Sequence, residues 1–320
     1  LQAIGRRVRT MTDDQYECFN DQLEPQLAEA GIRRLQPEHL TEQQAQVVQQ
    51  FFDDEVYSVL APMAVDSADD FPLLVNQTIN ICVRLKPAKD DSRKPSLAVI
   101  TCGRSVPRII TLPAAGGYSY VLLEDVICAF VERFFPGEEV AECIPFRITR
   151  NAELSLREDL AADLLLEMEE VLGDRKQNPC VRLELFEGST KTLRTFLQQA
   201  LRVANDDDVY LIPGPLGLSA FMSLTDLQAF DELKYDPWPP QQVPFIEPGQ
   251  SMFEVITRGD VLLYQPYESF DPVIHLIDEA ADDPDVLSIK QTLYRTRRNS
   301  SIVAALKRAA DQGKHVTAIV

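Results

Sequence analysis

Residues 286–320 read VLSIKQTLYRTRRNSSIVAALKRAADQGKHVTAIV, and their pattern is the clearest indication of an α/β fold in this chain. Its two apolar runs, VLSIKQTLY and HVTAIV, are typical of strands, and the IVAALKRAADQ pattern between them predicts a helix capped by Ser300 and stopped by Gly313. Upstream, VLLYQPY (261–267) predicts another strand, followed by a helix that starts at Asp271-Pro272. This βαβαβ order indicates a parallel sheet.

The two ends of the sequence indicate an internal fragment. The sheet is still being built when the sequence stops at Val320, and the opening LQAIGRRVRT has neither an initiator Met nor a secretion signal. We therefore expect truncation at both ends.

The loop after the second strand carries three arginines: Arg295, Arg297 and Arg298. Ligands bind at the carboxyl ends of strands in open α/β sheets, and the start of the next helix adds partial positive charge. Because a guanidinium fork matches phosphate oxygens, we expect these three arginines to bind phosphate. The alternative is a solvated basic loop beside a helix cap.

The charge of the chain is uneven. A net charge of −19 argues against wrapping nucleic acid or an anionic membrane. Residues 286–320 nevertheless hold seven Lys or Arg and one acid, a local excess of six positive charges that suits an anionic ligand, since screening acts beyond about 8–10 Å. No apolar run approaches the roughly 18–20 residues of a membrane span. The six scattered cysteines, which include no CxxC pair, fit a reducing cytoplasm, and peripheral membrane association is left open.

Two capping boxes, Thr12 with Gln15 and Thr41 with Gln44, predict helix starts near the N-terminus. Alternation over residues 79–85 then predicts a half-buried strand. Further strands are expected at LAVITC (97–102), CIPFRIT (143–149) and CVRLELF (180–186), helices at 160–172 and 193–201, and a proline-rich domain linker at 235–249.

Other candidate site residues are weaker. The six cysteines include no CxxC pair and are predicted to be small buried hydrophobes, neither a metal site nor a disulfide frame. His39, His275 and His315 lie far apart without metal-ligand spacing, and none receives a catalytic role. The GPLG segment (214–217) lacks the Lys and Ser/Thr of a phosphate-cradling loop, so it is predicted to be a turn.

Several long stretches resemble polyphosphate kinases of the phosphohistidine type, in the same order along the chain. They are FDDEVYSVLAPMAVD (52–66), LEDVICAFVERFFPG (123–137), FRITRNAEL (146–154), DDVYLIPGPLGL (207–218) and YQPYESFDPVIHLIDEAADDPDVLSIKQTLYRT (264–296). Two positions depart from the family pattern: Tyr264-Gln265 stands where two histidines are usual, and Ser301 where a proline is common.

The resemblance implies a multidomain fold of the α/β and α+β classes. Residues 1–52 would be the end of an N-terminal helical domain, 53–240 a mixed α+β head domain used in dimerisation, and 241–320 the start of a phospholipase-D-like α/β catalytic domain.

The resemblance also implies a transferase, an ATP-binding and magnesium-dependent phosphoprotein that reversibly moves the terminal phosphate of ATP onto inorganic polyphosphate and releases ADP. Arg295 falls on the family's magnesium and phosphate arginine; because a guanidinium has no lone pair for a cation, we assign it to the phosphate oxygens of a magnesium–phosphate assembly. The phosphorylated histidine is expected beyond Val320, so we expect no catalytic residue and no activity in this fragment alone. The alternatives are a non-catalytic dimerisation or polyphosphate-binding module and a phospholipase-D-like phosphodiesterase.

Overall fold

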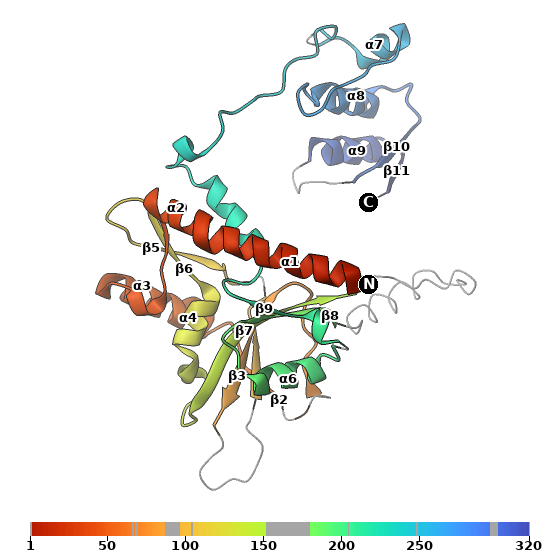
Figure 1. Cartoon of the computed structure of the whole chain (residues 1–320). Helices are drawn as coiled ribbons and strands as arrows, with labels where there is room; N and C mark the ends of the chain where they lie inside the picture. Colours follow the sequence, from red (N-terminus) through yellow and green to blue (C-terminus); the bar gives the residue numbers. More distant parts are fainter. Residues whose placement is uncertain are drawn as a thin grey trace, which may run out of the picture. The chain divides into compact units, whose positions relative to one another are not determined.

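The computed structural model describes residues 2–65, 67, 70–86, 97–103, 105–151, 180–203, 205–247, 249–294 and 300–319. The chain forms two compact units, Leu1–Ala229 and Phe230–Val320 (Figure 1). The expected mixed α and β architecture is confirmed, whereas the domain boundaries after residues 52 and 240 stay predictions. In the described part of the chain, every helix is too short or too polar to cross a lipid bilayer.

The first unit is built on a six-stranded sheet in the order β2-β4-β3-β7-β8-β9, in which only β8 and β9 run parallel. A smaller sheet has the order β1-β6-β5. The strands are β1 Ile32–Arg34, β2 Met63–Val65, β3 Ile79–Leu85, β4 Leu97–Thr101, β5 Ile109–Leu112, β6 Tyr118–Leu122, β7 Val140–Arg150, β8 Cys180–Phe186 and β9 Val209–Ile212.

Helices surround these sheets (Figure 1). The α-helices are α1 Gln2–Cys18, α2 Glu24–Glu29, α3 Glu42–Phe51, α4 Leu123–Ala129 and α6 Lys191–Ala200; the π-helices are η1 Phe19–Leu23 and η3 Phe52–Val56; and the 3-10 helices are η2 Pro37–His39, η5 Val131–Phe134, η7 Asp206–Asp208 and η8 Leu218–Asp226. The predicted strands and the helix over 193–201 are thereby confirmed, while the predicted helix at 160–172 lies outside the described residues.

Strand β3 is buried on both faces, so the prediction of a half-buried strand was wrong. Ile81 and Val83 belong to a core that includes residues of α3 and α4, whereas Cys82 belongs to a second core that includes Leu193 and Leu197 of α6. Helices therefore cover both sides of the sheet. The alternation of polar residues along β3, which suggested an exposed face, does not mark one.

The two capping boxes have different outcomes. At Thr41 the box is complete: the Gln44 amide donates to Thr41 Oγ1 at 3.4 Å and the Thr41 amide to Gln44 Oε1 at 3.0 Å. At Thr12 the prediction was wrong, because α1 already starts at Gln2 and Thr12 Oγ1 donates to the Val8 carbonyl at 2.9 Å. A threonine hydroxyl that bonds back one turn fits a helix interior.

The second unit contains the turn η9 Asp231–Leu233, the helices α7 Met252–Arg258, α8 Asp271–Asp282 and α9 Ser301–Asp311, and the strands β10 Ser288–Thr292 and β11 His315–Ile319. As predicted, β10 and β11 pair in parallel with α9 between them. Ile277 and Ala281 of α8 pack on Ala305, Leu306 and Ala309 of α9. Gly313 ends α9 with φ +86°, a left-handed conformation that glycine adopts without strain.

The segment VLLYQPY (261–267) is not a strand, which corrects the βαβαβ prediction to βαβ among the described residues. Leu262 is 85% exposed, Val261 and Leu263 are only half-buried, and no residue of the segment is fully buried. The amides of Tyr267 and Glu268 both donate to the Tyr264 carbonyl, at 3.0 and 2.9 Å, which closes a turn where a strand would continue. Pro266, which has no amide proton to donate to a sheet, interrupts the segment further.

Candidate functional site

The predicted phosphate-binding loop is entered from β10 and left into α9. Arg295, Arg297 and Arg298 themselves lie outside the described residues, which resume at Ser300. The described flanks keep both features on which the prediction depends: Thr292 and Ile319 are partners at the carboxyl ends of two parallel strands, and Ser300 directly precedes α9. The Ser300 side chain makes no capping hydrogen bond, so it does not occupy the first amide groups of the helix.

The positive charge counted over residues 286–320 is partly compensated by α8 and the turn that follows it. Arg308 Nη2 lies 2.8 Å from Asp278 Oδ1 and 3.7 Å from Asp282 Oδ2, and the hydrogen bond to Asp278 raises the pKa of the Arg308 guanidinium. Lys314 Nζ donates to the carbonyls of Asp283 and Val286. The excess of six positive charges counted over residues 286–320 therefore overstates the positive charge that this region offers to a ligand.

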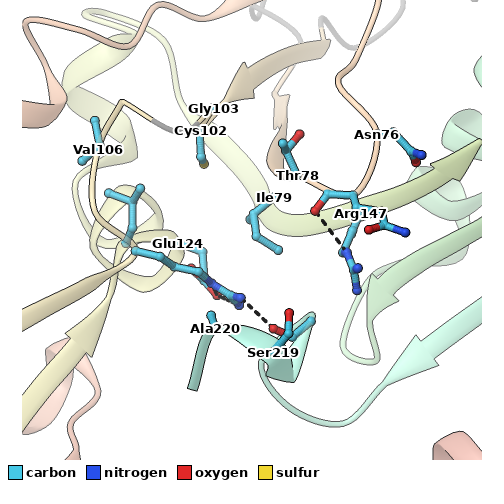
Figure 2. A pocket seen from close by; sticks show the side chains of 14 residues that line it. Asn76, Thr78, Ile79, Cys102, Gly103, Val106, Glu124, Arg147, Ser219 and Ala220 are labelled. Atoms are coloured by element: carbon cyan, nitrogen blue, oxygen red, sulfur yellow. Dashed lines mark hydrogen bonds and ion pairs between the residues drawn. The ribbon is translucent and has the colours of Figure 1, made fainter. Parts of the chain in front are cut away.

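A second candidate site is a cavity of about 320 Å³ in the first unit (Figure 2). It lies where the segment before β3, the loop after β4, the start of α4, strand β7 and the turn before η8 meet. Figure 2 shows Glu124, Arg147 and Ser219 around the same hollow, each from a different element.

Arg108 and Glu124 form one wall of this cavity. Arg108 Nε lies 3.0 and 3.1 Å from the two carboxylate oxygens of Glu124, whose side chain is only 4% exposed. The same guanidinium donates to the carbonyls of Gly217, at 3.0 Å, and Leu216. The buried Glu124 carboxylate thus positions Arg108, and Arg108 donates hydrogen bonds to the backbone just before η8.

Arg147 forms the opposite wall. Its Nη1 lies 3.1 Å from Glu184 Oε2, and its Nε donates to the Gln77 carbonyl at 3.3 Å. Arg182 Nη2 shares the same carboxylate, 2.8 Å from Glu184 Oε1. Gly217 has φ +64°, a left-handed conformation that favours glycine, and a Cβ added there would lie 3.1 Å from Arg147 Nη1, so that guanidinium would have to shift slightly. The predicted turn at GPLG corresponds to bends of the backbone at Gly214 and Leu216.

This arrangement can orient a small polar ligand, but it offers little net charge. Arg108 and Arg147 each face a carboxylate, which reduces their attraction for an added anion. Both arginines also donate to backbone carbonyls, those of Leu216, Gly217 and Gln77. These contacts favour a structural role, in which the two ion pairs stabilise the packing of segments that are distant in the sequence.

These ion-pair residues are not among those that the sequence predicts to form a site. A signal was present, however, because Glu124, Arg147 and Gly217 lie in three of the stretches that carried the family resemblance: 123–137, 146–154 and 207–218. These stretches meet at one cavity, which is a spatial relation that separate motifs do not reveal.

Among the described residues, no three or more His, Cys, Asp or Glu side chains form a group able to hold a metal ion. His39 lies in η2 and His315 begins β11, while His275 Nε2 lies 3.9 Å from Glu279 Oε2 on α8. The three histidines thus lie on separate elements and share no site.

Comparison with known proteins defines the class of this chain. Residues 43–224 match the model of the polyphosphate kinase middle domain, and residues 251–320 match that of polyphosphate kinase C-terminal domain 1. The chain belongs to the polyphosphate kinase family.

Individual relatives agree with this assignment. The chain is 39% identical over 387 residues to polyphosphate kinase from Rhodopirellula baltica and 38% identical over 323 residues to that from Pseudomonas aeruginosa; all of this chain is covered in both comparisons, with 45% and 47% of those proteins. It superimposes on the crystal structure of polyphosphate kinase from Porphyromonas gingivalis with a TM-score of 0.75 at 26% identity, covering 99% of this chain and 46% of that one. The chain thus spans about half the length of the curated relatives it matches.

Proposed function

We propose that this chain is part of an enzyme that reversibly transfers the terminal phosphate of ATP to inorganic polyphosphate and releases ADP. The observation that carries the proposal is the match, in order, to two successive domains of the polyphosphate kinase family, over residues 43–224 and 251–320. The fold agrees, since the structure superimposes on a polyphosphate kinase over 99% of its length.

In the proposed mechanism, a histidine outside these 320 residues attacks the γ-phosphate of ATP, and polyphosphate then accepts the phosphoryl group from that histidine. The contribution of this chain is electrostatic. Arg295, Arg297 and Arg298 donate hydrogen bonds to phosphate oxygens and neutralise the charge that develops there. The parallel edge of β10 and β11 and the start of α9 support this placement of the loop.

Magnesium is proposed as a companion of the nucleotide's phosphates. The described residues do not fit a metal site of their own, because no suitable cluster of His, Cys, Asp and Glu occurs among them. Arg295 would therefore contact phosphate oxygens of the magnesium–ATP substrate and not the ion, since a guanidinium has no lone pair to offer. We further propose that the enzyme forms a homo-oligomer through the head domain, residues 53–240, and acts in the cytoplasm, and that these 320 residues alone catalyse no transfer.

A binding titration tests the part of this proposal that the chain itself carries. Polyphosphate is titrated into the purified chain at low and high salt, and Arg295→Ala is compared with Lys307→Ala. Lys307 is an exposed cation of α9, and it makes no ion pair with any described residue, so it controls for the loss of one positive charge.

Salt-sensitive binding that Arg295→Ala abolishes and Lys307→Ala leaves within about twofold is the expected result. If Arg295→Ala and Lys307→Ala weaken polyphosphate binding equally, the loop acts only as part of a general basic surface. Absence of binding in the unchanged chain would leave only a scaffold role.

A further inference from the structure

Two cysteines that are distant in the sequence meet in the first unit. Cys128 lies near the end of α4 and Cys143 in β7, and their Sγ atoms are 2.9 Å apart. Both thiols are free and partly buried. To reach the S–S bond length of about 2.05 Å the two sulfur atoms need to approach by only about 1 Å, and α4 already contacts β7.

The pair is also reachable. Cys128 and Cys143 line a cavity of about 390 Å³, together with Asp125, Pro145 and Phe186. Phe186 is an exposed side chain at this cavity, so the cavity has a border at the protein surface. A small uncharged oxidant such as hydrogen peroxide fits a space of this size.

The chemistry of the pair depends on proximity more than on acidity. The hydrogen bond with Cys143 raises the pKa of the Cys128 thiol, and burial and the carboxylates of Asp125 and Glu124 raise it further. Since the thiolate is the reactive form, the first step with an oxidant is slow at neutral pH. Once one sulfur is oxidised, the second lies next to it and needs no diffusion to react.

We propose that Cys128 and Cys143 form a reversible thiol–disulfide modification site, oxidised by peroxides and restored by dithiols. In the first step a thiol sulfur takes one oxygen from hydrogen peroxide to become a sulfenic acid, and one water leaves. In the second step the other thiol attacks the sulfenic sulfur, the S–S bond forms, and the hydroxyl leaves as a second water. A dithiol reverses the change: it supplies two electrons and two protons to the pair and is itself oxidised to a disulfide.

Cys102 is the nearest rival. It is buried in the same hydrophobic core, and burial, followed by the neighbouring Glu124 and Cys128, raises the pKa of its thiol. No short sulfur contact joins Cys102 to either partner among the described residues, so the geometry favours Cys143 over Cys102 as the partner of Cys128.

The test is peptide mapping of the unchanged chain. The purified protein is treated with hydrogen peroxide, denatured, alkylated and digested, and cross-linked peptides are identified by mass spectrometry. We expect one intramolecular Cys128–Cys143 cross-link that protects two of the six cysteines from alkylation and disappears after dithiothreitol. Because this readout uses the unchanged chain, it does not depend on any variant folding.

Variants sharpen the result. Cys143→Ser should abolish the cross-link, whereas Cys18→Ser, which removes an exposed lone thiol on α1, should leave it intact. A cross-link from Cys128 to Cys102, a cross-link between chains, or oxidation of both sulfurs without a cross-link would each overturn the proposal.

Discussion

Replacing Glu124 by Gln should destabilise the first unit far more than a like replacement at an exposed ion pair. Glu124 is 4% exposed and its partner Arg108 18%, so the variant leaves a guanidinium nearly buried without its counter-charge. Removing one partner of a buried pair costs about 3–5 kcal/mol. Because the carbonyls of Leu216 and Gly217 still accept from Arg108 and the Gln side chain keeps the shape, we expect a cost somewhat below that range, about 2–3 kcal/mol.

The matched control is Glu139→Gln. Glu139 pairs with Lys86 at the surface, where the two side chains are 69% and 51% exposed, and such pairs contribute about 0–1 kcal/mol. Urea denaturation followed by far-UV circular dichroism gives the free energy of unfolding of each variant. Trp238 lies in the second unit, so its fluorescence reports on that unit separately.

A double variant tests the reason for the effect. Adding Arg108→Met to Glu124→Gln removes the uncompensated charge and should recover about 1 kcal/mol or more of the loss. An uncompensated charge on Arg108 is not the cause if Glu124→Gln lowers the free energy of unfolding no more than Glu139→Gln does. The same conclusion follows if the double variant is less stable than Glu124→Gln alone.

Three further predictions concern single residues of the first unit. Thr41→Ala should lower the free energy of unfolding by about 1 kcal/mol through loss of the helix cap, as measured by urea denaturation; an unchanged midpoint would contradict the capping role. Gly217→Ala should cost about 1–3 kcal/mol, because alanine is strained at φ +64° and its Cβ would press on Arg147; a melting temperature equal to that of the unchanged chain would count against this. Burial, and then the neighbouring Glu124, raise the pKa of Asp125 to about 7, so the folded state binds a proton more tightly than the unfolded state and stability falls as pH rises from about 4 to 7. Asp125→Asn should therefore be more stable than the unchanged chain at pH 8 and lose that advantage near pH 4; an equal difference in unfolding free energy at both pH values would refute the assignment.

The sequence predicted those elements whose signals are local. Thr41 and Gln44 form the expected box, and Gly313 ends α9 as expected, because these interactions involve neighbouring residues only. The same local pattern at Thr12 failed because α1 had already begun upstream, and a mid-helix threonine can satisfy its hydroxyl without a cap.

Features that depend on tertiary neighbours were not predictable in this way. The burial of β3 on both faces depends on α6, which lies more than a hundred residues later. Likewise, Cys128 and Cys143 share no sequence motif, and only the packing of α4 on β7 brings them together. The cavity pairs Arg108–Glu124 and Arg147–Glu184 are of the same kind, since ordinary charged residues acquire a role only through their partners.

The proposed transfer of phosphate from ATP to polyphosphate can be measured directly by a phosphoryl-transfer assay on the longer enzyme that we propose. Incorporation of the terminal phosphate of labelled ATP into polyphosphate is measured for the unchanged enzyme, for Arg295→Ala and for Lys307→Ala. We predict polyphosphate synthesis by the unchanged enzyme, a loss of about 10²-fold or more in Arg295→Ala, and near-normal synthesis in Lys307→Ala. Failure of the unchanged enzyme to incorporate phosphate would contradict the proposed function, and full activity of Arg295→Ala would contradict the role of the loop.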